Sequence, residues 1–168
     1  FFASVGAAVL AWTPSPAALL LCALCVQLRL ACNLLDGMVA VEGGKQTATG
    51  VIYNEFPDRI ADSLLIVALG YGAFHPWLGW LGAVLAGMTA YVRVFGGSLG
   101  QVQDFRGPMA KPHRMAALTV ACIAGAAEMY WHGTRYSLLV GAIVIAAGSL
   151  LTCVTRTRAI VSQLRAAA

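Results

Sequence analysis

Oxygen-bearing side chains recur at helical spacing in two neighbouring segments of this sequence. The first segment holds Asn33, Asp36, Gly37 and Ala40, and the second holds Gly50, Asn54, Asp58 and Asp62. Residues three or four positions apart share one face of an α-helix, so each segment predicts a polar stripe. Adjacent antiparallel helices can bring two such stripes together. Clustered carboxylate and amide oxygens suit a hard cation such as Mg²⁺ or Mn²⁺.

The elements that must position these stripes are membrane helices. Of the 168 residues, 60% are hydrophobic and only 11% are charged, and the mean hydropathy is +0.77. A soluble domain usually carries about 25% charged residues, whereas one transmembrane helix needs roughly 20 apolar residues. We therefore predict an all-α integral membrane protein with six transmembrane helices, in a single domain over residues 1–168.

Prolines, glycines and polar runs divide the chain into these helices. We expect five spans, at residues 17–40, 53–72, 77–100, 115–130 and 136–154. Residues 1–12 are expected to be the end of a truncated first helix whose beginning lies before residue 1.

Basic residues lie on alternate connections, which indicates how the helices are oriented. Lys45, the 101–114 stretch and the tail after residue 154 share one side. By the positive-inside rule this side is cytoplasmic, with both termini there. The tail is expected to bind anionic lipid headgroups. The basic residues gather mainly in these short connections between apolar runs, so we expect the net charge of +4 to reflect membrane topology and expect no nucleic-acid partner.

Charged residues at membrane depth are candidates for function because an idle charge there is costly. Arg93 follows a long apolar run, and we expect it to bind a phosphate. Arg29 lies one turn before Asn33 and is expected to pair with a carboxylate or a phosphate.

The two polar segments resemble the signature of the CDP-alcohol phosphotransferases, Asp-x2-Asp-Gly-x2-Ala-Arg-x8-Gly-x3-Asp-x3-Asp, on the second and third of six transmembrane helices. The corresponding residues are Asn33, Asp36, Gly37, Ala40, Val41, Gly50, Asn54 and Asp58, of which five are identical in type. Asn33 and Asn54 replace aspartates, and Val41 replaces an arginine. Asp62, one turn after Asp58, and Glu55 are candidates to restore the lost charge.

The resemblance implies a role for each of these residues. Asp58 would be the general base and a metal ligand. The other implied ligands of Mg²⁺ or Mn²⁺ are Asn33, Asp36 and Asn54. We expect Asp62, one turn beyond the signature, to be a further ligand. The residues implied to line the nucleotide site are Gly37, Ala40, Gly50 and Arg93.

The implied reaction transfers a phosphatidyl group from a CDP-alcohol, by resemblance CDP-diacylglycerol, to a small alcohol with release of CMP. Such an enzyme of phospholipid synthesis belongs in a bacterial inner (plasma) membrane, with its site facing the cytoplasm. Family members commonly form homodimers, so a homodimer is a possible oligomeric state for this chain. Two alternatives also stay open. One is a family member that binds lipid or nucleotide without turnover. The other is an intramembrane prenyltransferase, because Asn54-x3-Asp58-x3-Asp62 resembles the first metal motif of those enzymes.

Overall fold

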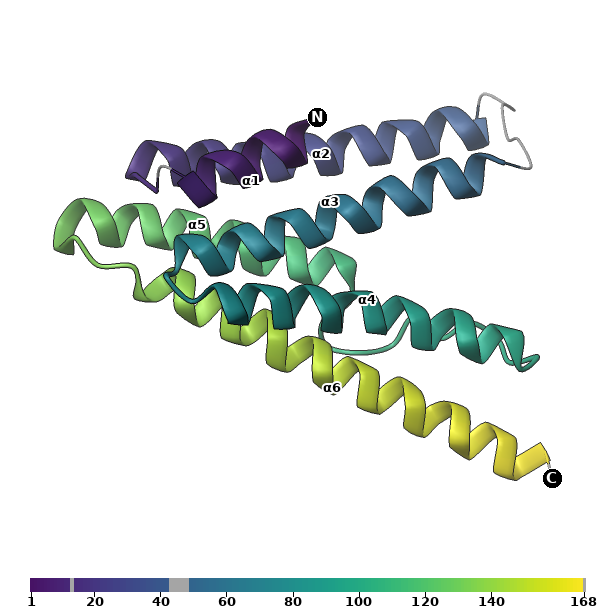
Figure 1. Ribbon diagram of the computed structural model, residues 1–168. Coiled ribbons are helices and arrows are strands. Elements are labelled where there is room, and N and C mark those ends of the chain that lie inside the picture. The colour runs from purple at the N-terminus through teal and green to yellow at the C-terminus, as the bar shows by residue number, and fades with distance from the viewer. Residues whose placement is uncertain (13, 43–48, 168) are drawn as a thin grey trace.

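The protein is built from six α-helices. The computed structural model describes residues 1–12, 14–42 and 49–167, and no strand occurs in those ranges. The helices are α1 (Phe2–Trp12), α2 (Pro16–Glu42), α3 (Gly50–Gly72), α4 (Pro76–Ser98), α5 (Lys111–His132) and α6 (Tyr136–Ala167) (Figure 1). The predicted all-α class is therefore confirmed, as are the breaks near residues 12–16 and 72–76.

Three of the described helices are long and apolar enough to cross a membrane. They cover Pro16–Val39, Pro76–Ser98 and Tyr136–Ala166, and they indicate a membrane protein. Helices α3 and α5 have 23 and 22 residues, which also matches the length of a span, but both carry several charged side chains. Helix α1 has only 11 residues. The count of six spans stays a prediction.

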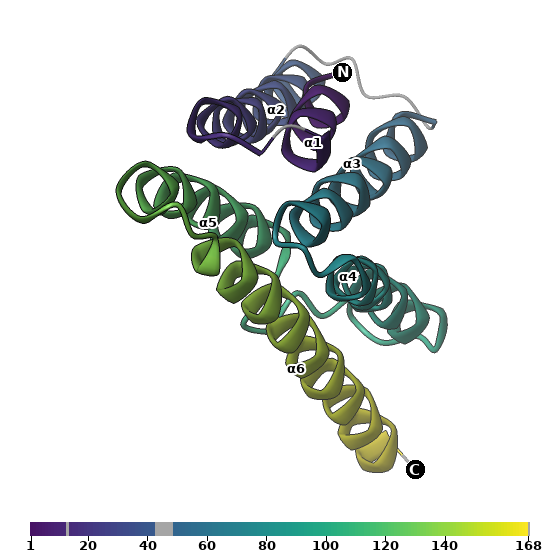
Figure 2. The same cartoon turned by 60° about the vertical axis from the view of Figure 1, so that its left-hand side comes forward.

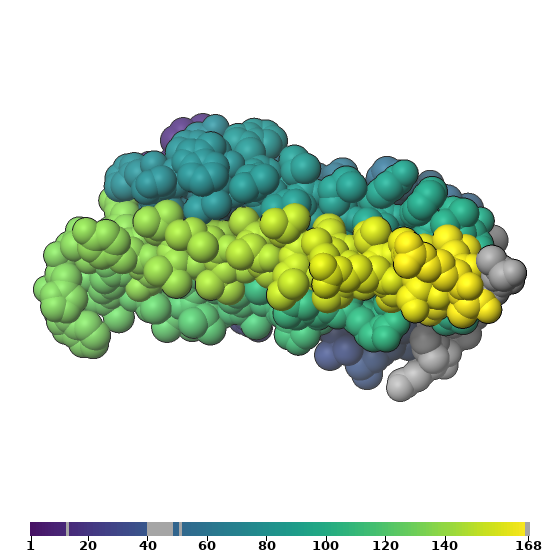
Figure 3. Space-filling model, turned by 90° about the horizontal axis from the view of Figure 1, so that it is seen from below, coloured from purple at the N-terminus to yellow at the C-terminus, as the bar shows by residue number. Residues whose placement is uncertain are grey.

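The polar connections lie toward one end of the helix bundle. The end of α2, the start of α3 and the C-terminus are at this end, the 99–110 connection starts there and runs back toward the middle of the bundle, and the three short turns are at the other end (Figure 1). This is the alternation that the basic residues predict. Figure 3 shows α6 running beside α4 along the whole of one face of the molecule.

Two helices extend beyond their predicted bounds. Helix α5 begins at Lys111 rather than Met115, because Pro112 in its first turn is compatible with a helix start. Helix α6 continues to Ala167 rather than ending near residue 154, since residues 155–167 contain neither glycine nor proline. One tail residue is therefore not at the lipid surface as expected. Arg156 is buried and donates hydrogen bonds to the carbonyls of Thr89 and Arg106.

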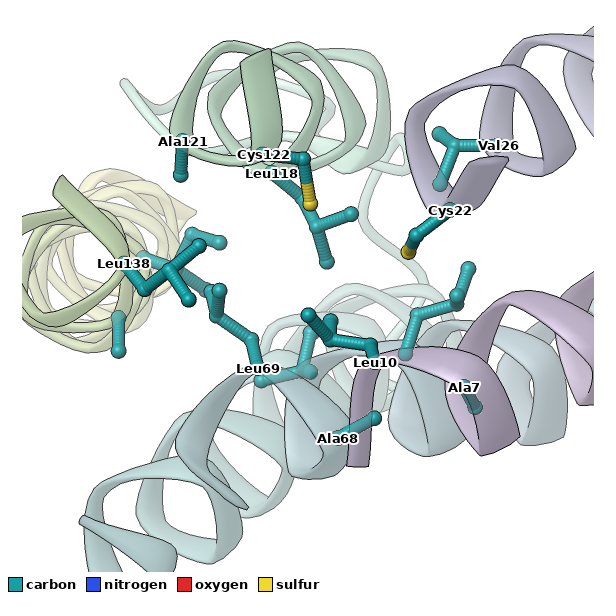
Figure 4. Close-up of a cluster of buried hydrophobic side chains, with 14 of the residues drawn as sticks. Ala7, Leu10, Cys22, Val26, Ala68, Leu69, Leu118, Ala121, Cys122 and Leu138 are labelled. Carbon is teal, nitrogen blue, oxygen red and sulfur yellow. The ribbon is translucent and has the colours of Figure 1, made fainter. Parts of the chain in front are cut away.

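The apolar core lies where the six helices meet, away from the polar end, and α4 contributes Leu78, Ala83 and Ala86 to it. Leu10, Cys22, Leu69, Leu118 and Leu138 come from α1, α2, α3, α5 and α6, and all are fully buried (Figure 4). Figure 2, in which the helices are seen obliquely, shows how these elements are arranged around a common centre. Much of the core is alanine, with two cysteines, which is typical of membrane helices packed through small residues.

Helices α3 and α4 touch through their backbones at two glycines. A Cβ added to Gly70 would lie 2.5 Å from the backbone nitrogen of Gly79, and one added to Gly79 would lie 2.7 Å from the carbonyl oxygen of Val67. No side chain fits between these helices there. By contrast, the described parts of α2 and α3 do not pack backbone to backbone, so only long side chains connect these two helices.

Candidate functional site

The two predicted polar stripes meet at Asp58 on α3. The Asn33 side-chain amide on α2 donates a hydrogen bond to Asp58 Oδ1 at 2.8 Å. Arg29, one turn earlier on α2, forms ion pairs with Asp58 and Asp62, and its Nη1 lies 2.7 Å from Asp62 Oδ1. The expected pairing of Arg29 with a carboxylate is confirmed. Asn33 and Arg29 thus bridge the space between α2 and α3.

Helix α5 supplies two more cations to the same carboxylates. Lys111 forms an ion pair with Asp58 Oδ2. Arg114 lies 3.4 Å from Asp62 Oδ2, and it also donates a hydrogen bond of 2.8 Å to the carbonyl of Met109. Residues 111 and 114 are three apart and therefore share the face of α5 that looks toward α3. From the sequence we expected both residues in the polar 101–114 stretch, and no sequence pattern predicted their contacts with these aspartates.

We call the five charged residues Arg29, Asp58, Asp62, Lys111 and Arg114 the Asp58 cluster. Only 9% of Asp58 and 2% of Asp62 is exposed, and Arg29 and Arg114 are buried as well. Buried charges are stable only when they are paired. Here three cations surround two carboxylates, so the cluster carries a formal charge of +1. Its field favours an anion such as a phosphate.

The remaining motif residues lie outside this cluster. Asp36 and Asn54 are exposed, and neither forms a hydrogen bond or ion pair with another described residue. Gly37 is half-buried, and a Cβ built there would meet no described atom within 4 Å. Gly37 therefore does not mediate helix packing, although a ligand would have room beside it.

Some of the expected site falls outside the described residues. The side chains of Ala40, Val41 and Glu42 are not described, and Lys45 lies between the described ranges. Gly50 is half-buried at the first residue of α3.

Arg93 and Glu55 form a separate group beside the cluster. Arg93 Nη2 lies 2.9 Å from Glu55 Oε1, and its guanidinium stacks on the Phe105 ring at 4.9 Å from the centroid. Arg59 Nε contacts the same Glu55 oxygen at 2.9 Å. Of the two residues considered as replacements for lost charge, only Asp62 joins Asp58. Glu55 instead neutralises arginines.

The five predicted oxygen donors do not converge on one point. Asp58 and Asp62 are held by cations, whereas Asp36 and Asn54 are exposed to solvent. Among the described residues, no three His, Cys, Asp or Glu side chains are grouped so as to hold a metal ion. This donor arrangement does not fit Mg²⁺ or Mn²⁺, because a metal would have to displace Lys111 or Arg29 from Asp58. The metal stays a prediction.

The connection between α4 and α5 has its own ion pair. Asp104 Oδ1 accepts hydrogen bonds from the backbone N–H of Arg106 at 2.8 Å and from its Nε at 3.0 Å. The Arg106 guanidinium thereby lowers the pKa of the Asp104 carboxyl below its usual value. This pair stabilises the loop locally and provides a carboxylate that is separate from the Asp58 cluster.

Comparison with known proteins adds no further family information. No protein-family model matches the chain, and no curated protein matches it significantly. The family resemblance accordingly depends on the spacing and types of the motif residues alone.

Proposed function

We propose that the protein is a membrane enzyme that transfers a phosphatidyl group from CDP-diacylglycerol to a small alcohol and releases CMP. The hydrogen bond between Asn33 and Asp58 is the observation that carries the proposal. These residues occupy the first and last positions of the motif, 25 residues apart in sequence. Their contact supports treating the two segments as halves of one site.

The residues of the Asp58 cluster suggest a division of roles in this reaction. The alcohol oxygen attacks the phosphorus of the phosphatidyl group, and the bond from phosphorus to the CMP oxygen breaks. CMP leaves with the electron pair, and Asp58 accepts the proton of the alcohol as general base. Arg29 and Lys111 would attract the phosphates through charge-assisted hydrogen bonds. A phosphate that competes for Lys111 would free Asp58 Oδ2.

The proposal includes the membrane arrangement and the cofactor. We infer six spans with both termini cytoplasmic, in a bacterial plasma membrane, because the polar connections share one end of the bundle. Mg²⁺ or Mn²⁺ is the cofactor implied by the motif resemblance. Since the present donor arrangement does not fit a metal, we assign no reaction step to it.

A second candidate function is binding of a lipid or nucleotide without turnover. The full pairing of Asp58 by Arg29, Lys111 and Asn33 favours it, because a carboxylate held by cations is a weak base. The asparagines at positions 33 and 54 also favour it, since an amide binds Mg²⁺ less strongly than a carboxylate.

A substrate screen separates the two functions. Purified protein is incubated with CDP-diacylglycerol, a panel of labelled alcohols, and Mg²⁺, Mn²⁺ or EDTA. A prenyl diphosphate donor with an aromatic acceptor tests the prenyltransferase alternative. The proposal expects CMP release that depends on one alcohol, is lost in EDTA and persists in Asp104→Asn. CDP-diacylglycerol binding without CMP release for any alcohol would establish the binding function instead.

A further inference from the structure

A groove on the surface between α3 and α4 is separate from the Asp58 cluster. It has a volume of about 610 Å³, and apart from the Glu55 and Arg59 side chains its lining is mainly apolar and aromatic. Residues at the two ends include Phe56 and Val94 at one, and Val67 and Trp80 at the other. Its volume is within the range of small-molecule sites, about 300–1,000 Å³. The groove is therefore large enough for a specific ligand.

The length of the groove matches one leaflet of a bilayer. Its α3 lining runs from Glu55 to Val67, which is about 18 Å at a rise of 1.5 Å per residue. Half of a hydrocarbon core of about 30 Å is about 15 Å. Because α4 runs antiparallel to α3, Trp80 lies opposite Val67 at the deep end, and Val94 lies opposite Glu55 at the polar end. An acyl chain entering from the polar end would lie along the apolar lining.

The polar end of the groove carries an excess positive charge. Arg59 and Arg93 both contact Oε1 of Glu55, so two guanidiniums share one carboxylate. The Nε of Arg93 is buried and has no hydrogen-bond partner in the described part of the chain. This end of α3 lies on the same side of the bundle as the other basic connections (Figure 1). A phosphate at headgroup level would complement this charge.

We propose that this groove holds one phospholipid with an anionic headgroup as a resident lipid. Its phosphate contacts Arg59 beside Glu55, and one acyl chain lies over Leu64 and Val67 toward Trp80. The inference is independent of the proposed enzymatic function, because no residue of the Asp58 cluster lines the groove and lipid binding requires no turnover. A zwitterionic lipid fits less well, since its own cation would oppose the two arginines.

Native mass spectrometry of the intact protein tests the proposal. Protein in detergent is equilibrated with equal amounts of phosphatidylglycerol and phosphatidylcholine, and the retained lipid is counted. We expect one tightly held phosphatidylglycerol in the wild type. Arg59→Gln should lower its retention about fivefold, the effect expected of one basic residue at a lipid headgroup. The control Arg158→Gln removes an exposed charge on α6 outside the groove and should retain the lipid.

A second pair of variants tests the apolar part. Ser63→Trp fills the groove, whereas Ala147→Trp adds the same bulk to an exposed position on α6. We expect lipid loss only in Ser63→Trp. Equal retention of phosphatidylcholine, equal effects of the two charge variants, or equal effects of the two tryptophan variants would overturn the proposal. A dimer that Ser63→Trp dissociates would also overturn it, because a second copy would then occupy the groove.

Fluorescence provides a readout that requires no destabilising substitution. Trp80 lines the groove, and brominated acyl chains quench tryptophan at short range. Brominated phosphatidylglycerol should quench the wild type more than brominated phosphatidylcholine does, and Trp80→Phe should abolish that difference. Equal quenching by the two lipids would contradict a headgroup-specific site.

Discussion

The α2–α3 motif has a paired end, at Asn33 and Asp58, and an open end nearer the α2–α3 connection, at Asp36 and Asn54, and the protein holds these two ends differently. Asp58 and Asp62 are buried and paired with cations from α2 and α5, whereas Asp36 and Asn54 are exposed and unpaired within the described residues. The same contrast separates Gly79, which touches the α3 backbone, from Gly37, which touches nothing described. The paired end therefore contributes to stability, and the open end is available to a ligand.

The largest expected difference in stability is between two single variants, each of which removes one carboxylate from one end. Asp62→Ala leaves the buried Arg114 without a carboxylate and leaves Arg29 with Asp58 alone, and it should lower the free energy of unfolding by about 3–5 kcal/mol. Asp36→Ala should change it by less than about 0.5 kcal/mol. Unfolding in detergent, followed by helicity, measures both. Similar losses in the two variants would show that the ends do not differ.

The glycines test the same contrast without changing charge. Gly79→Ala forces a methyl group into the α3 backbone and should cost about 1–3 kcal/mol. Gly37→Ala meets open space within a helix, so stability should rise by up to about 1 kcal/mol, while CMP release falls if Gly37 lines the nucleotide site. Thermal unfolding and the CMP assay report these outcomes. A loss of stability in Gly37→Ala would show that Gly37 makes a packing contact, which would contradict the open space beside it.

Lys111→Met changes the balance of charge at the paired end. Removing the positive charge that pairs with Asp58 Oδ2 frees this oxygen and removes a repulsion toward a divalent ion, which we expect to raise affinity about tenfold, equivalent to about 1.4 kcal/mol. Mn²⁺ titration should therefore show at least this tightening, and Arg158→Met on the surface of α6 should show none. An unchanged Mn²⁺ affinity in Lys111→Met would show that Asp58 is not a metal ligand.

Sequence patterns predicted the helices and part of the site because both depend on local spacing. Asp58 and Asp62 of the predicted second stripe face α2, whereas Asn54 is exposed, and Arg29 pairs with a carboxylate as its position one turn before Asn33 indicates. Lys111 and Arg114 could not be predicted, since their contacts join residues 52 and 53 positions apart and depend on how α5 packs. Arg156 was missed for the same reason, because carbonyls of distant segments bury it.

The smallest change in rate is expected from restoring the aspartates. The double variant Asn33→Asp, Asn54→Asp replaces two neutral amides with carboxylates and should tighten metal binding. Turnover should change by less than about threefold, equivalent to under about 1 kcal/mol in the barrier. CMP release and Mn²⁺ titration on the same samples measure this. Activity that appears only in the double variant would support the binding function for the natural chain.

The central claim is that Asp58 acts as a base rather than only as an ion-pair partner. Its most direct test is the initial rate of CMP release from CDP-diacylglycerol with the accepted alcohol, for wild type and for Asp58→Asn at equal helicity. The account predicts a wild type that turns over and a variant slower by about 100-fold or more, the usual contribution of a general base. A wild type that releases no CMP with any alcohol, or an Asp58→Asn variant as fast as the wild type, would contradict it.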